Sequence, residues 1–67
     1  MRQGLLVKLK RIEKGYTTLE FAKQLGISRE YLRLIEKGRA KNPSVELMKS
    51  IAEILETSVL ELFFKEE

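Results

Sequence analysis

The chain contains no cysteine, no histidine and no aspartate, and each absence excludes a class of chemistry. Without cysteine there is no disulfide, and without cysteine and histidine together the usual zinc sites cannot be assembled. The usual nucleophile–base pairs are also missing, and the ten glutamates and two tyrosines show no paired arrangement suited to acid–base catalysis. The composition therefore argues against an enzyme, and we expect no metal and no cofactor.

Long apolar runs are also absent. No stretch approaches the ~20 apolar residues of a membrane helix, and the N-terminus carries no apolar segment of the signal-peptide type. We therefore expect a cytoplasmic protein with no membrane partner. The length predicts one domain, 1–67, with no room for a separate domain that binds a small-molecule ligand. A chain this short buries only about 60% of its unfolded surface, so packed helices and self-association should stabilise it, which favours a homodimer.

Positive charge is concentrated in the first two thirds of the chain. Residues 1–42 hold 11 Lys and Arg against 4 Glu, a net charge of +7, whereas residues 43–67 hold 2 Lys against 6 Glu, a net charge of −4. This asymmetry favours one face that meets a polyanion and another that is turned away from it. Solvated helix faces that happen to divide in this way are the alternative.

Apolar residues recur at a spacing of three to four residues and never sustain a strand-like alternation, so the sequence predicts an all-α fold. Glycines and capping residues delimit the helices. The expected helices are 3–14, 18–25, 29–37, 45–56 and 59–64.

The same spacing predicts which residues form the core. In the first helix Leu5, Leu9 and Ile12 recur at i, i+4 and i+7, and Leu6 widens the stripe that we expect to be buried. The other predicted core residues are Phe21, Ala22, Leu25, Leu32, Ile35, Val45, Met48, Ile51, Ala52, Leu55, Val59, Leu62 and Phe63.

Two short helices are expected to meet at a tight turn. Thr17 and Glu20 form a Thr-x-x-Glu capping box that opens the second helix. Gly26 ends that helix, and only one further residue separates it from Ser28, the N-cap of the third helix. Helices joined so closely must cross at a large angle, which is the helix-turn-helix arrangement.

Several short motifs occur in a characteristic order. They are Lys14-Gly15-Tyr16-Thr17, Phe21-Ala22-x-x-Leu25-Gly26-Ile27-Ser28, Ile35-Glu36-Lys37-Gly38, Asn42-Pro43-Ser44 and Ser58-Val59-x-Glu61-Leu62-Phe63. With these motifs the sequence resembles the Cro/C1-type helix-turn-helix family of phage repressors and Xre-like bacterial regulators, from about Leu6 to Phe63. The resemblance implies a compact, five-helix, lambda-repressor-like domain that binds double-stranded DNA. It also implies a largely buried structural ion pair between Arg11 and Glu36.

The third helix is the expected recognition helix, because its N-terminal residues and outward face would meet base edges in the major groove. The candidate base-reading residues are Arg29, Glu30, Tyr31, Arg33 and Leu34. Arg29 suits guanine, since its planar fork can hold O6 and N7 together. Glu30 could accept a hydrogen bond from cytosine N4, or it could interact with the N-terminus of its own helix. Tyr31 could contact a thymine methyl group or a phosphate, or its ring could pack over the turn.

A second group is expected to contact phosphates, which positions a protein on DNA without reading its sequence. Its members are Thr18, Ser28, Lys37, Arg39, Lys41 and Asn42, and Arg33 suits this role as well as base reading. Thr18 stands where the family commonly has glutamine, and Leu34 where a polar residue is usual. The alternative for the basic members is a solvated charged loop.

Leu60 and Phe64 flank the expected buried face of the last helix, and apolar residues exposed at a terminus suggest an interface. We therefore predict a homodimer that reads an inverted repeat, with recognition helices about 34 Å apart. The leading interpretation is a transcriptional regulator, acting as a repressor. The alternatives are the antitoxin of a toxin–antitoxin pair, or a helix-turn-helix used for protein–protein contact; the acidic C-terminal part also suits a second protein partner.

Overall fold

Four α-helices and one π-helical turn follow one another in the computed structural model, which describes residues 3–41 and 43–64. The elements are α1 (Gln3–Glu13), α2 (Thr18–Leu25), α3 (Arg29–Glu36), α4 (Val45–Ile54) and the π-helical turn η1 (Leu60–Phe64). The described residues contain no strand, so the predicted all-α class is confirmed. None of the described helices is long and apolar enough to cross a membrane.

Side-chain caps set the starts of the helices. The Thr17 hydroxyl accepts from the Glu20 amide at 3.1 Å, and the Glu20 carboxylate accepts from the Thr17 amide at 3.0 Å, so the capping box is complete. Ser28 and Ser44 each accept from the amide three residues on, at 3.0 Å. These bonds satisfy amides that the first turn of a helix leaves without a partner.

The ends of three predicted helices are corrected. The first and third helices each end one residue earlier than predicted, at Glu13 and Glu36. The fourth ends at Ile54 instead of 56, because Glu56 adopts a left-handed conformation with φ of 59°. The Thr57 amide then donates to the Ala52 carbonyl at 2.9 Å and closes the helix end. The last predicted helix is a π-helical turn that begins one residue later than predicted.

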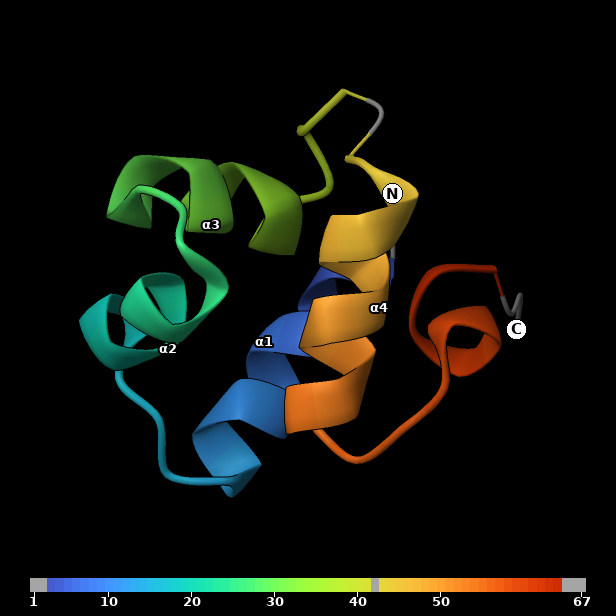
Figure 1. The fold of residues 1–67 in the computed structure, drawn as a ribbon, viewed down its shortest axis with the longest axis horizontal. Coiled ribbons are helices and arrows are strands. Elements are labelled where there is room, and N and C mark those ends of the chain that lie inside the picture. The colour runs from blue at the N-terminus through green and yellow to red at the C-terminus, as the bar shows by residue number, and fades with distance from the viewer. Residues whose placement is uncertain (1–2, 42, 65–67) are drawn as a thin grey trace.

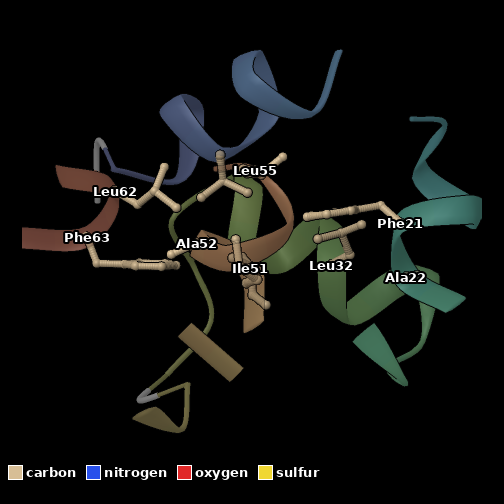
Figure 2. Packing of buried hydrophobic residues seen from close by; sticks show 10 residues of the cluster. Phe21, Ala22, Leu32, Ile51, Ala52, Leu55, Leu62 and Phe63 are labelled. Carbon is tan, nitrogen blue, oxygen red and sulfur yellow. The ribbon is translucent and has the colours of Figure 1, made fainter. Parts of the chain in front are cut away.

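The helices surround one apolar cluster. In Figure 1, α2 and α3 lie together on one side, α4 crosses in front of α1, and η1 lies beyond α4. Figure 2 shows Phe21 and Leu32 directed toward Ile51 and Leu55, with Phe63 on the other side. The buried hydrophobic residues in the described part of the chain are Val7, Phe21, Ala22, Leu32, Ile35, Ile51, Ala52, Leu55, Leu62 and Phe63.

The predicted buried stripe of α1 is wrong. Leu5, Leu9 and Ile12 are 55%, 53% and 54% exposed, and only Leu6 of that prediction packs against the core, where it is partly buried. The buried face instead carries Gly4, Val7 and Arg11.

Gly4 explains this orientation of α1. A Cβ atom at Gly4 would lie 2.7 Å from the Glu36 carbonyl oxygen and 2.8 Å from the Gly38 amide nitrogen, and it would also clash with the Ile35 carbonyl oxygen. The backbone of α1 therefore rests directly on the C-terminal end of α3. Only the face of α1 that carries the glycine can approach so closely.

Four other predicted core positions are only partly buried or are exposed. Val45 is 62% exposed, because it is the first residue of α4 and lies before the helix reaches the cluster. Leu25, Met48 and Val59 are partly buried and pack against the cluster from its edge.

Candidate nucleic-acid interface

The turn between α2 and α3 sets the direction in which α3 leaves. Gly26 adopts φ of 72°, a left-handed conformation that a side chain would disfavour. Its amide donates to the Lys23 carbonyl at 3.1 Å, and the next amide, of Ile27, donates to the Ala22 carbonyl at 3.0 Å. Ser28 then caps α3 by accepting from the Tyr31 amide. Main-chain bonds therefore hold the α2 side of the turn, and the Ser28 hydroxyl holds the α3 side.

The outward face of α3 is defined by the residues that it buries. Leu32 and Ile35 are 0% and 1% exposed, which anchors one side of the helix in the cluster. The side chains left exposed on α3 are Arg29, Glu30, Arg33 and Leu34, the last at 43%. Tyr31 is partly buried and packs against the cluster, so its side chain is less available on the outward face than those of its neighbours.

Arg11 of α1 and Glu36, the last residue of α3, form a buried ion pair. Arg11 Nε lies 2.7 Å from Glu36 Oε2, and Arg11 Nη2 lies 3.4 Å from Oε1. Arg11 Nη1 also donates to the Tyr16 carbonyl at 2.8 Å. One guanidinium thus connects α1, the α1–α2 loop and the end of α3. Both charged residues are buried, so the negative charge of Glu36 is neutralised and withdrawn from the outward face.

The loop after α3 folds back onto that helix. The amides of Arg39 and Ala40 both donate to the Leu34 carbonyl, at 2.8 Å and 3.2 Å. These bonds hold the start of the loop beside the last turn of α3, where Lys37 and Arg39 are both exposed.

The exposed face of α3 and its following loop is strongly basic. Its exposed cations in the described part of the chain are Arg29, Arg33, Lys37, Arg39 and Lys41, and the only exposed acidic residue between the first and last of them is Glu30. None of these cations forms an ion pair with another described residue. Such an unpaired group of cations attracts a polyanion and releases its counterions on binding.

The remaining candidates are less closely grouped. Thr18 is half-buried as the first residue of α2, and the exposed Ser28 hydroxyl already accepts the Tyr31 amide. Asn42 lies outside the described residues. Gly4, which seats α1 under the end of α3, was not among the predicted site residues, although a glycine inside an apolar helix was the available signal.

The family model described as Helix-turn-helix matches residues 7–62 of the chain. The chain belongs to the helix-turn-helix family. The resemblance to Cro/C1-type regulators predicted from the motifs is thereby confirmed.

Two curated relatives and two solved structures extend this result. The chain is 40% identical to the HTH-type transcriptional regulator SlrR of Bacillus subtilis over 60 residues, which cover 90% of the chain and 40% of SlrR. It is 36% identical over 56 residues to SinR of the same organism, covering 84% of the chain and 50% of SinR. Both relatives are transcriptional regulators, which agrees with the argument from composition against an enzyme.

The solved structures share the fold. SinR in complex with DNA is 35% identical, with a TM-score of 0.79 over 90% of this chain and 95% of that one. The SinR–SinI protein complex is 34% identical, with a TM-score of 0.83 over 97% of this chain and 62% of that chain. The lambda-repressor-like helical fold expected from the sequence therefore matches the DNA-binding fold of SinR. The helix-turn-helix chain spans half or less of the length of the two curated relatives.

Proposed function

We propose that this helix-turn-helix chain is a sequence-specific regulator of transcription that represses by covering its operator in double-stranded DNA. The observation that carries the proposal is the unpaired group of cations on the outward face of α3 and its loop, beside an acidic residue, Glu36, that Arg11 neutralises. The DNA complex of the similar SinR protein supports the same mode of binding. Because the DNA of a bacterium lies in its cytoplasm, a regulator of this kind would act there.

The side chains divide into two roles within this proposal. Arg29 and Arg33 read bases, with Glu30, Tyr31 and Leu34 at the rim of the same face. Lys37, Arg39 and Lys41 contact phosphates, together with Ser28, Thr18 and Asn42. Four to six phosphate contacts would give log K a slope of roughly −4 to −5 against log salt concentration.

The proposal includes a homodimer on an inverted repeat. Leu60 and Phe64 on η1 are 68% and 59% exposed, and large apolar side chains exposed together suit a contact between copies. A two-fold contact there would set two recognition helices about one helical turn of DNA apart. The SinI complex of SinR supports the further proposal of a second protein partner.

Selection of bound sequences from a random duplex pool tests this function. We expect a palindromic consensus. Arg29→Ala should lose the preference at one base of each half-site, at a cost of about 1–3 kcal/mol for that base. Lys41→Ala should weaken all sequences alike and reduce the salt slope by about 1. Lys49→Ala, an exposed lysine on α4, is the control and should change neither property. Failure to retain any duplex in dilute buffer would refute the proposal.

A further inference from the structure

α1 carries an apolar stripe that no described part of the chain covers. Leu5, Leu9 and Ile12 are each more than half exposed, although they recur at the i, i+4, i+7 spacing of a helix that packs against another. Leu9 and Ile12 also line an open depression together with Leu6, Lys10 and Glu13. Three large apolar side chains aligned on one exposed helix face indicate a binding surface.

The stripe points away from the DNA-binding side. At about 100° per residue, its centre lies about 120° around α1 from Gly4 and Arg11. Those two residues face the end of α3, through the close backbone contact and the ion pair with Glu36. A second molecule on the stripe would therefore leave the outward face of α3 open.

Charged residues beside the stripe indicate which molecule fits. The spacing makes Leu5 and Ile12 the d positions and Leu9 the a position of a heptad. Lys8 then occupies g, and Glu13 occupies the e position five residues later. Both are exposed, and neither forms an ion pair with another described residue. In a parallel pair of helices, g of one chain lies opposite the following e of the other, so Lys8 and Glu13 complement each other across such a pair.

We propose that α1 pairs in parallel with α1 of a second copy of this chain. Leu5, Leu9 and Ile12 face their own counterparts across a two-fold axis, and Lys8 of each copy lies opposite the partner's Glu13. An antiparallel pair would place like flanks together, so it would bring the Lys8 flanks of the two copies against each other and leave Glu13 without its cation. The charges therefore select the parallel arrangement.

The contact is weak and separate from the proposed contact at Leu60 and Phe64. Three half-exposed side chains from each copy bury much less than the ~1,200–2,000 Å² of a stable interface. Copies already bound to neighbouring DNA sites are at high effective concentration, where a weak contact of this kind is populated. The α1 pair would join such copies, giving cooperative binding between sites.

Exchange of the two charges tests the pairing. Sedimentation equilibrium is carried out on the chain with Leu60→Gln and Phe64→Gln, two exposed positions whose replacement removes the other proposed contact between copies. In that chain Lys8→Glu and Glu13→Lys should each weaken self-association about tenfold, and the two charge changes together should recover it. Leu9→Gln should weaken it as well. Val45→Gln is the matched control, since Val45 is an exposed apolar residue on another helix, and it should have no effect. Thermal unfolding of each variant verifies that it is folded.

A cross-link tests the parallel geometry independently. The chain has no cysteine, so Ile12→Cys places one thiol at a d position. There a parallel pair brings the two Cα atoms within the roughly 4.4–6.8 Å that a disulfide spans. We expect oxidised Ile12→Cys to form a disulfide-linked dimer, to lose it when Lys8→Glu is added and to regain it with Lys8→Glu and Glu13→Lys together. Cross-linking no faster than that of Val45→Cys, or self-association that the charge variants leave unchanged, would overturn the proposal. DNA binding at a single site should be unchanged in all of these variants.

Discussion

Replacing Gly4 with alanine tests how closely α1 is seated on α3. The new Cβ would lie 2.7 Å from the Glu36 carbonyl oxygen and 2.8 Å from the Gly38 amide nitrogen, and it would also clash with the Ile35 carbonyl oxygen. Because all three are main-chain atoms, a helix has to move. Overpacking costs about 1–3 kcal/mol, and contact with three fixed atoms favours the upper end. Alanine's higher helix propensity offsets up to about 1 kcal/mol. We therefore expect a net loss of about 2 kcal/mol.

Circular dichroism during thermal and urea unfolding measures this loss, which corresponds to a decrease in Tm of roughly 8–16 °C for a domain of this size. Lys23→Ala, an exposed substitution on α2, is the control and should stay within about 0.5 kcal/mol. DNA affinity of the folded variant should fall too, since Gly38 leads into the loop that carries Arg39. A Gly4→Ala variant as stable as the parent would mean that helix propensity dominates and that the helices are not in tight contact.

Three further changes test other contacts of the fold. Arg11→Met should cost about 3–5 kcal/mol because it leaves Glu36 buried without its cation, and adding Glu36→Leu should recover most of that loss; additive losses in urea unfolding would contradict this. The hydrogen bond between Lys14 and Glu56 raises the pKa of Lys14 and lowers the pKa of Glu56. The stabilisation by this pair should be complete between pH 4.5 and pH 10.5, the ordinary pKa values of glutamate and lysine. It should be lost as pH falls through the lowered pKa of Glu56 or rises through the raised pKa of Lys14. Glu56→Gln should therefore flatten the dependence of Tm on pH. Gly26→Ala should cost about 1–2 kcal/mol in thermal unfolding through backbone strain alone, since a Cβ there meets nothing within 4 Å.

The helix starts are predictable from this sequence because their signals are local. Thr17, Ser28 and Ser44 each precede a helix by one residue and cap an amide three residues on. Gly26 takes the left-handed conformation expected of it, so the tight turn follows from neighbouring residues alone. The end of α4 was harder to predict, because a left-handed Glu56 is not a residue that usually ends helices.

The outward face of α3 was predictable for a related reason. Leu32 and Ile35 are the apolar residues at helical spacing that face the cluster, and their burial leaves the basic side chains outside. The fold of the following loop was not predictable, because Arg39 and Ala40 are held by main-chain bonds to the Leu34 carbonyl. A single sequence carries no side-chain pattern that signals those bonds.

The orientation of α1 shows how a tertiary contact overrules an apolar pattern. A turn of about 120° that buried Leu5, Leu9 and Ile12 instead would gain about 1–1.5 kcal/mol for each, since each is already half-buried. The same turn would expose Val7, at a cost of about 1.5–3 kcal/mol, and would separate Arg11 from the buried Glu36, at a cost of about 3–5 kcal/mol. The losses exceed the gain. The observed orientation is therefore favoured even though it leaves the more apolar stripe in water, and that stripe remains available to a second copy of the chain.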